Sequence, residues 1–395
     1  MISVQEASEI ILSNLIKPTS RKVDLPRSLG KVLAEDVAAD RDFPAFDRAT
    51  MDGIAIQLQA YQNGQREFII ESIQAAGEPK GKLKNLTQCI EIMTGAALPI
   101  GCDAVVPYEN FKISNGIATL SDSTVLLSQN IHFQGSDAKK NQKLLPVGSR
   151  ISSAELALLA SVGKSSVSIF ELPKAAIIST GNELVDIETN PLSHQVRKSN
   201  SYALQAAYAN MGGESSLFHL PDDEIVIAKE LEKILADFDF ILLSGGVSKG
   251  KFDFIPQRLE ALGIKKLFHQ VSQKPGKPMW FGRSSNKFVF ALPGNPVSTF
   301  MCFHKYVKPW AMLSLGISAS TEKAILAANY EFKSPVTYFL QVQIKNEEGK
   351  VMAYPIAGGG SGDFVNLINV DGFLELPKEK VEFQAGEAYP IIQFR

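Results

Sequence analysis

The feature that most constrains this chain is an alternation of strand-like and helix-like segments between residues 174 and 310. The expected order is strand 175–178, helix 201–211, strand 215–220, helix 223–236, strand 240–243, helix 253–262, strand 265–269, strand 288–292 and helix 297–313. Such alternation predicts an open, mostly parallel α/β sheet. Because ligands of these sheets bind beyond the carboxyl ends of the strands, the loops at those ends are where a site is expected.

Glycine-rich and lysine-bearing turns occupy this part of the chain. They are Ser179-Thr180-Gly181-Asn182-Glu183, Ser244-Gly245-Gly246-Val247-Ser248, Lys274-Pro275-Gly276-Lys277-Pro278 and Pro293-Gly294-Asn295-Pro296-Val297-Ser298. Glycine lets backbone N–H groups approach an anion, and a following helix adds the positive end of its dipole. Taken alone, the glycine turn and the lysine turn are each better explained by ordinary turn or surface chemistry. Together they predict a site for an anionic, phosphate-bearing ligand, although neither a Walker loop nor a G-x-G-x-x-G fingerprint is present.

Three acidic residues, Glu183, Asp222 and Asp253, lie near expected strand ends or helix starts. Helix capping is the simpler reading of each one. Mg²⁺ is usually bound by one or two carboxylates together with substrate phosphates. A magnesium role is therefore expected, above all for Asp222 and Asp253.

The rest of the chain predicts further domains, since 395 residues exceed one ordinary core. We expect an amphipathic helix at 5–17, a β-rich region from 21 to 141, a helix at 153–161, and a small β domain beyond residue 318. A formal net charge of −2 gives no general attraction to nucleic acid. No segment resembles a signal peptide or a membrane span, so a cytoplasmic protein without membrane contact is expected. The three cysteines and five histidines show no disulfide or metal-ligand spacing.

Motifs along the whole chain resemble those of the molybdopterin molybdenumtransferases, the MoeA family, which is also seen in the C-terminal half of gephyrin. The matching residues are Pro44-x-Phe46-x-x-x-x-Met51-Asp52-Gly53, Thr94-Gly95-Ala96, Gly135-x-Asp137, Ser179-Thr180-Gly181-x-Glu183-Leu184, Ser199-Asn200, Ser244-Gly245-Gly246-Val247-Ser248, Lys274-Pro275-Gly276-Lys277-Pro278 and Leu292-Pro293-Gly294-Asn295-Pro296. So many motifs in the family's order make the resemblance specific.

The resemblance implies a multidomain α/β plus β protein and a homodimer. The implied domains are 1–38 with 141–172 (domain I), 39–140 (β-rich domain II), 173–315 (the molybdopterin-binding α/β domain III) and 316–395 (domain IV, resembling a β-barrel). It also implies the reaction, in which adenylylated molybdopterin and molybdate give molybdenum cofactor and AMP with Mg²⁺. A molybdopterin adenylyltransferase is the implied donor of the substrate.

Site residues carried over from the family's motifs fall into three groups. The resemblance implies that Asp222 and Asp253 bind magnesium. It implies that molybdate is contacted by Lys274, Lys277 and Ser298, with Ser361 of the Gly-Ser-Gly turn as a further substrate contact. It implies a pterin-phosphate or nucleotide cradle built from Ser244, Gly245, Gly246, Ser248, Pro293, Asn295 and Pro296. It gives catalytic roles to Asp52, Thr94, Asp137 and Glu183, with Asp52 and Thr94 reaching the crevice of the partner protomer.

The chain departs from the family in places. Ile54 follows Met51-Asp52-Gly53 where tyrosine is usual, Lys249 stands where a small or apolar residue is common, and no C-terminal arginine can be placed at the molybdate site. Two alternative functions stay open: a molybdopterin adenylyltransferase on the same α/β scaffold, and a peptide-binding scaffold like that of gephyrin. The large flanking domains argue against the first, and the lack of a long linker argues against the second.

Overall fold

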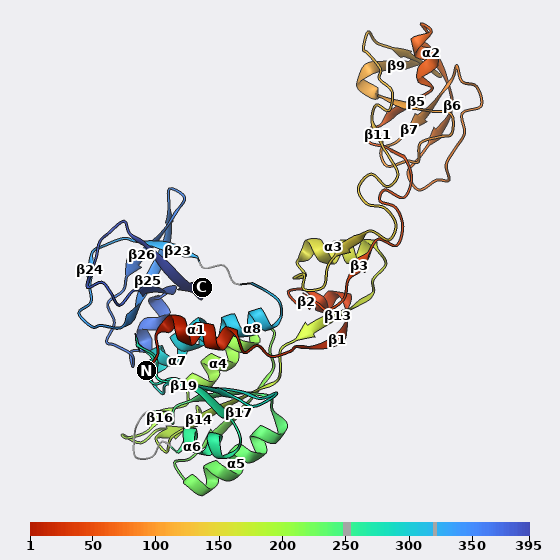
Figure 1. Cartoon of the computed structure of the whole chain (residues 1–395). Coiled ribbons are helices and arrows are strands. Elements are labelled where there is room, and N and C mark those ends of the chain that lie inside the picture. Colours follow the sequence, from red (N-terminus) through yellow and green to blue (C-terminus); the bar gives the residue numbers. More distant parts are fainter. Residues whose placement is uncertain (248–253, 319–321) are drawn as a thin grey trace. The chain divides into compact units, whose positions relative to one another are not determined.

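The structure is a computed structural model that describes residues 1–247, 254–318 and 322–395 (Figure 1). The chain divides into two compact units. Unit 1 comprises residues 1–23, 30–34 and 168–395, and unit 2 comprises residues 24–29 and 35–167. Each unit has its own hydrophobic clusters and is described separately below.

Unit 1 contains the expected α/β sheet. Its strand order is β17 (Ser215–Leu220), β14 (Ala175–Thr180), β18 (Phe240–Ser244), β22 (Phe288–Leu292), β21 (Trp280–Arg283) and β19 (Lys265–His269). The first four strands pair in parallel, whereas β21 is antiparallel to both of its neighbours. The mostly parallel open sheet is confirmed, and β21 is a strand that the sequence analysis did not anticipate.

Alternate residues of the central strands face opposite layers, as the two-residue period of a strand requires. Phe240 and Leu242 of β18 belong to one cluster, and Ile241 and Leu243 belong to the other. The first layer contains α1 (Val4–Leu12), α4 (Asn200–Ala209), α7 (Pro296–Cys302) and α8 (Lys308–Ser314), and the second contains α5 (Glu224–Asp237) and α6 (Ile255–Ala261) (Figure 1). The sheet is therefore covered on both faces, which explains its continuous apolar strands.

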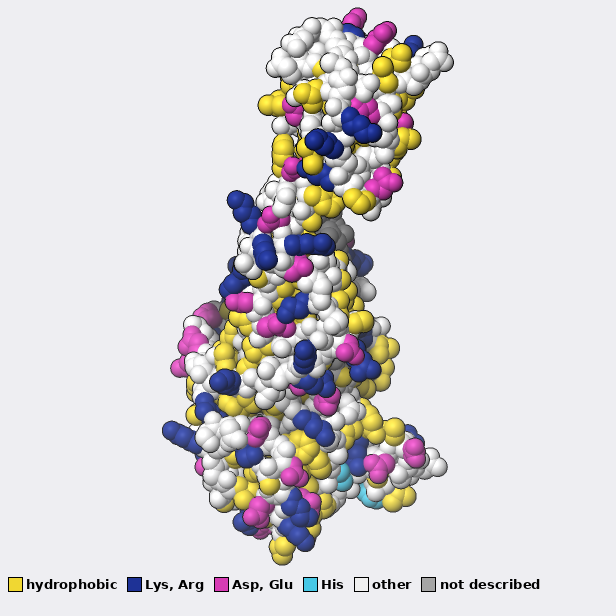
Figure 2. Space-filling model, turned by 90° about the vertical axis from the view of Figure 1, so that its right-hand side faces the viewer, with side chains coloured by type: hydrophobic (Ala, Val, Ile, Leu, Met, Phe, Trp, Pro, Cys, Tyr) yellow, Lys and Arg dark blue, Asp and Glu magenta, His cyan; other side chains and the backbone are white. Residues whose placement is uncertain are grey.

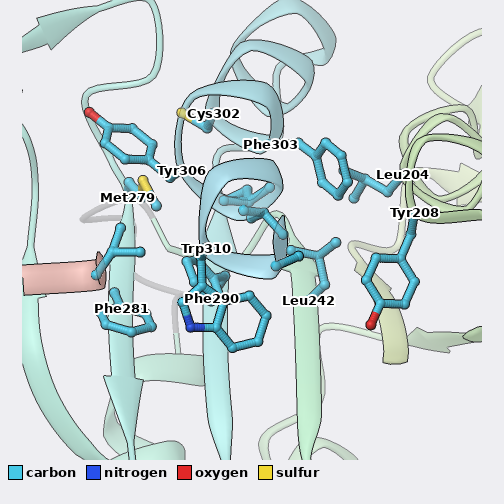
Figure 3. Close-up of a cluster of buried hydrophobic side chains, with 14 of the residues drawn as sticks. Leu204, Tyr208, Leu242, Met279, Phe281, Phe290, Cys302, Phe303, Tyr306 and Trp310 are labelled. Carbon is cyan, nitrogen blue, oxygen red and sulfur yellow. The ribbon is translucent and has the colours of Figure 1, made fainter. Parts of the chain in front are cut away.

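The helix expected at 297–313 is continuous but not uniform. Residues Phe303–Val307 form a π-helical turn between α7 and α8. Trp310 of α8 packs on Phe290 of the sheet, with ring centroids 5.2 Å apart (Figure 3). It also packs on Phe240, with ring centroids 4.9 Å apart. This aromatic packing holds the whole segment against the sheet.

Helix α1 begins where expected but ends at Leu12, five residues before the expected end. Ser3 and Glu6 form a capping box at its start. At its end, the Ser13 hydroxyl and the Asn14 amide donate to the carbonyls of Glu9 and Ile10. Side chains that bond the last-turn carbonyls compete with further helix, so the helix stops before Pro18.

The C-terminal part of unit 1 is a closed five-stranded barrel, as the resemblance implied. Its strands follow the ring order β25 (Thr337–Glu347), β26 (Lys350–Pro355), β23 (Lys323–Leu326), β29 (Ala388–Gln393) and β27 (Gly372–Leu376). The pairing of β27 with β25 closes the ring. Strand β20 (Gln273–Lys274) joins β25 in parallel with Lys274 opposite Tyr338, so the two-lysine turn is attached to the barrel.

Unit 2 is β-rich, as expected. Its main sheet has the order β8 (Ala104–Pro107), β5 (Gly53–Ile56), β7 (Cys89–Ile92), β6 (Glu67–Gln74), β10 (Ile117–Leu120) and β9 (Phe111–Ser114). Shorter elements are β3 (Val37–Ala38), β4 (Arg48–Ala49), β11 (Ile131–His132), β12 (Lys143–Leu145), α2 (Leu58–Gln62) and α3 (Ser153–Ser161). A small sheet of β1 (Thr19–Asp24), β13 (Ser166–Glu171) and β2 (Val32–Leu33) lies where the chain passes between the units.

Charged side chains of both signs are interspersed on the face drawn in Figure 2. The cysteines Cys89, Cys102 and Cys302 are buried free thiols, and burial raises the pKa of each. In the described ranges, no helix combines the length and apolar character needed to cross a membrane.

Candidate functional site

A pocket of about 660 Å³ opens at the carboxyl ends of β14, β18 and β22. This is the place that the parallel sheet predicts for a ligand. Eight of the expected site residues line it: Glu183, Asp222, Ser244, Gly245, Gly246, Pro293, Asn295 and Pro296. We call it the strand-end pocket.

The glycine pair after β18 is required by the backbone geometry. Gly245 and Gly246 have φ angles of +97° and +69°. A Cβ atom on Gly245 would lie 2.7 Å from Thr180 Oγ1, and one on Gly246 would lie 2.8 Å from Ile255 Cγ1. The N–H of Gly245 donates to Leu292 O at 3.1 Å. The N–H of Gly246 has no backbone partner within the described ranges, so it is the donor of the pair that can face an anion.

Asn200 ties the strand ends together. Its Nδ2 donates to Ser244 Oγ at 2.9 Å, to Gly294 O at 2.7 Å and to Thr299 Oγ1 at 3.3 Å. Ser244 is 3 % exposed, and its hydroxyl also lies 3.4 Å from that of Thr299. The Ser244 hydroxyl is thus engaged in holding the two glycine turns together. The sequence analysis gave Ser199-Asn200 as a family motif but assigned Asn200 no role.

Acidic and basic side chains surround the strand-end pocket. Asp222 and Asn182 are held reciprocally: Asn182 N donates to Asp222 Oδ2 at 3.2 Å, and Asp222 N donates to Asn182 Oδ1 at 3.1 Å. Asp222 and Glu183 are both exposed, and Lys198, also in the lining, pairs with Asp186 at 2.7 Å. Lys198 and the neighbouring Arg197 are cations that sequence reasoning missed.

The residues present fit a magnesium ion only in part. No group of three or more acidic, histidine or cysteine side chains within the described ranges could hold a metal. Mg²⁺ needs few protein ligands when substrate phosphates supply the others, and Asp222 has one carboxylate oxygen without a described partner. Ser248 and Asp253, also expected at the site, lie outside the described residues.

A second pocket, of about 680 Å³, adjoins the first and shares Pro278, Pro293, Gly294 and Asn295 with it. Its lining combines the two-lysine turn with the C-terminal barrel, and it includes the expected residues Lys274, Lys277, Ser298 and Ser361. We call it the lysine pocket. Sequence reasoning could not place its barrel wall, because that wall depends on how the barrel meets the α/β domain.

Buried Gln273 holds the lysine turn in shape. Its Nε2 donates to Gly276 O at 3.0 Å, and its Oε1 accepts from the hydroxyl of buried Tyr306. Gly276 has φ +89°, and a Cβ there would lie 2.5 Å from Cys302 Sγ. The turn is therefore fixed from beneath, while Lys274 and Lys277 on its outer side are exposed.

Both lysines are available for an anion. Neither forms a salt bridge with any described residue. The Lys274 ammonium lies 5.6 Å from the ring centroid of Phe332, which stacks on Tyr338 at 4.0 Å. A cation over an aromatic face keeps its charge and gains orientation. Two unpaired positive charges in a pocket can bind a tetrahedral oxyanion.

The turn containing Ser361 lies at the start of α7. Ser361 O accepts from Val297 N at 3.1 Å, and Ser361 Oγ accepts from Asn295 Nδ2 at 2.8 Å. Asn295 thus connects the strand-end pocket to the barrel side of the lysine pocket.

Asp52, Thr94 and Asp137 lie in unit 2. Asp52 Oδ1 accepts from Thr94 N at 2.6 Å, and this backbone hydrogen bond is the main reason that the pKa of Asp52 is lowered. Asp137 Oδ1 lies 2.7 Å from His132 Nε2, and Arg48 Nη2 lies 3.2 Å from the other ring nitrogen. The structure brings Asp52 and Thr94 of two separate motifs together.

Comparisons with known proteins match this architecture over the whole chain. Residues 2–163 match the model of the MoeA N-terminal region (domain I and II), residues 176–312 match that of the "Probable molybdopterin binding domain", and residues 323–394 match that of the MoeA C-terminal region (domain IV). A molybdopterin molybdenumtransferase of Synechocystis sp. is 38% identical over 395 residues, covering 99% of each chain. The chain belongs to the MoeA family.

Other MoeA relatives agree. A molybdopterin molybdenumtransferase of Bacillus subtilis is 31% identical, covering 94% of this chain and 89% of its own. The crystal structure of a molybdopterin biosynthesis MoeA protein from Pyrococcus horikoshii OT3 is 30% identical, with a TM-score of 0.84 and complete coverage of both chains. Membership in the MoeA family makes this chain an enzyme of molybdenum cofactor biosynthesis.

Proposed function

We propose that this enzyme inserts molybdate into adenylylated molybdopterin in a Mg²⁺-dependent reaction that releases AMP. The observation that carries the proposal is the pair of adjoining pockets. One is bordered by a glycine turn and carboxylates, and the other by two lysines that form no salt bridge with the residues the structure describes. A ligand that carries both a phosphoanhydride and a metal-accepting group can occupy both pockets at once.

The proposed chemistry is positioning with charge stabilisation. Lys274 and Lys277 bind and orient molybdate, while the glycine turn after β18 cradles the phosphate through the N–H of Gly246. Pre-organised donors aimed at developing negative charge are the largest catalytic contribution in many enzymes, and orientation adds to it. Asp222, together with Asp253 and substrate phosphate oxygens, would hold Mg²⁺. When bound there, the ion supplies charge neutralisation at the phosphates.

We further propose that the enzyme works as a cytoplasmic homodimer. In this arrangement Asp52 and Thr94 of one protomer complete the crevice of the other, with Asp137 and Glu183 in supporting roles. A molybdopterin adenylyltransferase supplies the substrate. The four-domain division at residues 38, 140, 172 and 315 stays a prediction.

The test compares two reactions of the purified chain. We expect AMP release from adenylylated molybdopterin to require molybdate and Mg²⁺, and we expect no adenylylation of molybdopterin by ATP. Lys274→Ala should lower the rate of molybdate-dependent AMP release by about 100-fold, the typical effect of losing one oxyanion donor. Adenylylation without molybdate-dependent AMP release would instead support the adenylyltransferase alternative. Absence of both reactions in the folded wild-type chain would favour the scaffold.

A further inference from the structure

An arginine, a histidine and an aspartate of unit 2 form a connected row of side chains. Arg48 lies on β4 and His132 lies on β11, and the antiparallel register places these two residues directly opposite each other. Arg48 Nη2 lies 3.2 Å from His132 Nδ1, and His132 Nε2 lies 2.7 Å from Asp137 Oδ1. The three side chains are therefore linked through both nitrogens of one imidazole ring.

The arginine determines which ring nitrogen of His132 carries the hydrogen. A guanidinium group can only donate hydrogen bonds, so His132 Nδ1 must be the acceptor and carry no hydrogen. The hydrogen of the ring is then on Nε2, which donates it to the Asp137 carboxylate. Donation along the row therefore runs from Arg48 to His132 and from His132 to Asp137.

The row engages one oxygen of the Asp137 carboxylate and leaves the other free. Oδ1 accepts from His132 Nε2, and Ser136 Oγ donates to the same oxygen at 3.4 Å. Among the described residues, none forms a hydrogen bond or ion pair with Asp137 Oδ2. The Asp137 side chain is 55 % exposed, so this second oxygen can accept a hydrogen bond from a ligand.

The backbone that carries Asp137 is also held in place. Gly135 N donates to Pro44 O at 3.0 Å, and Asp137 N donates to Phe43 O at 2.9 Å. Gly135 has a φ angle of +68°, which favours glycine at this turn. Because the backbone is fixed, the freedom left to Asp137 is rotation of its side chain. The hydrogen bond from His132 restricts that rotation.

We propose that His132, with its tautomer set by Arg48, is a positioning residue that orients Asp137 to accept a hydrogen bond from the bound substrate. The proposal rests on the proposed function, in which Asp137 supports the reaction of adenylylated molybdopterin with molybdate. A displacement of about 1 Å at a reacting group can cost about 100-fold in rate, so the orientation of this carboxylate matters. His132 acts through geometry alone, and no bond to it forms or breaks.

Three substitutions of His132 separate its two hydrogen bonds. A glutamine amide reaches the position of Nε2, an asparagine amide reaches that of Nδ1, and phenylalanine keeps a ring without either nitrogen. His132→Gln can still donate to Asp137, so it should keep most of the single-turnover rate of molybdate-dependent AMP release. His132→Asn and His132→Phe lose that donor and should lower the rate about tenfold or more. The affinity for molybdate should stay unchanged in all three variants, because the lysine pocket is intact.

Lys143→Met is the matched control, because it removes a partly exposed ion pair with Asp36 in the same unit. Exposed pairs of this kind contribute little stability, so the control and the His132 variants should all fold. The control should keep the wild-type rate. Equal losses of rate in His132→Gln and His132→Phe would overturn the positioning role.

Nitrogen NMR of the His132 ring tests the tautomer independently of activity. Near neutral pH the wild type should show a hydrogen on Nε2 and none on Nδ1. Arg48→Met should shift the Nδ1 resonance, because this nitrogen loses its hydrogen-bond donor. A hydrogen on Nδ1 in the wild type, or an Nδ1 resonance that ignores Arg48→Met, would overturn the role of Arg48.

The proposed function and the positioning role can fail separately. A wild-type rate in Asp137→Ala, with AMP release lost in Lys274→Ala, would overturn the role of His132 and leave the proposed function standing. Absence of molybdate-dependent AMP release in the wild type would overturn both.

Discussion

At the residue scale, buried or half-buried polar side chains set the positions of the exposed reactive ones. Gln273 and Asn200 are examples: the first fixes the lysine turn, and the second joins the two glycine turns. Both side chains are uncharged. They affect the binding of an anion indirectly, because they fix the backbone of the turns that line the two pockets.

Replacing Gln273 by methionine should affect both stability and binding. The Tyr306 hydroxyl and the Gly276 carbonyl would lose their partner, and a buried group left unsatisfied costs about 1–3 kcal/mol. We expect that loss in the free energy of unfolding, measured by urea denaturation, together with weaker molybdate binding. The double variant Gln273→Met with Tyr306→Phe should recover part of the stability but not the binding. Full recovery of binding would show that Gln273 does not position the lysines.

Much of the residue-level site follows from the sequence, because turn chemistry is local. The Gly245-Gly246 pair is required by its own φ angles, and Lys274 and Lys277 lie within one proline-flanked turn. Asn200 escapes such reasoning, because its role depends on hydrogen bonds to Ser244 and Gly294, which are distant in the sequence. Its residue type alone is compatible with a helix cap.

At the element scale, the segment from α7 to α8 contains a buried titratable group. His304 is 9 % exposed, lies in the π-helical turn and packs among Phe300, Phe303 and Phe394. Neither ring nitrogen has a hydrogen-bond partner among the described residues. Burial, aided by Lys308, lowers the pKa of His304 to about 3, so the ring is neutral in the fold.

The depressed pKa predicts a pH dependence of stability. The unfolded histidine takes up a proton near pH 6.5 and the folded one does not, so stability is full above that pH and falls below it. Between pH 7.5 and pH 5 we expect a loss of about 2 kcal/mol attributable to His304. Urea denaturation at the two pH values should show this loss in the wild type and in the exposed control His194→Asn, but not in His304→Phe. Equal losses in all three proteins would contradict the assignment.

The helices and strands with a strong hydrophobic pattern were predicted well. The features that the sequence analysis missed have local physical causes. The parallel strands β14, β18 and β22 are continuous apolar runs, which only a sheet covered on both faces accommodates. Strand β21 was missed because Trp280 to Arg283 directly follows the lysine turn and includes a glycine that reads as a break. The closing contact of the barrel, between β25 and β27, joins strands about 30 residues apart and carries no local signal.

At the scale of the whole molecule, the proposed homodimer predicts the activity of a mixture of two variants. Asp52→Asn alters unit 2 and Lys274→Ala alters unit 1, so each homodimer should be inactive if both residues serve every site. If Asp52 serves the crevice of the partner, mixed dimers contain one intact site. Dissociating and reassembling an equal mixture should restore roughly a quarter of wild-type AMP release, since half the dimers are mixed and half of their sites are intact. No restoration, with mixed dimers confirmed by mass spectrometry, would contradict the shared site.

The proposed function requires that one reaction joins release of the nucleotide to insertion of the metal. It is tested most directly by measuring AMP released and molybdenum incorporated into molybdopterin in the same single-turnover reaction with adenylylated molybdopterin, molybdate and Mg²⁺. We expect equimolar amounts that appear together, and a parallel loss of both in Lys274→Ala. AMP release at the same rate without molybdate, or molybdenum incorporation without AMP, would contradict it.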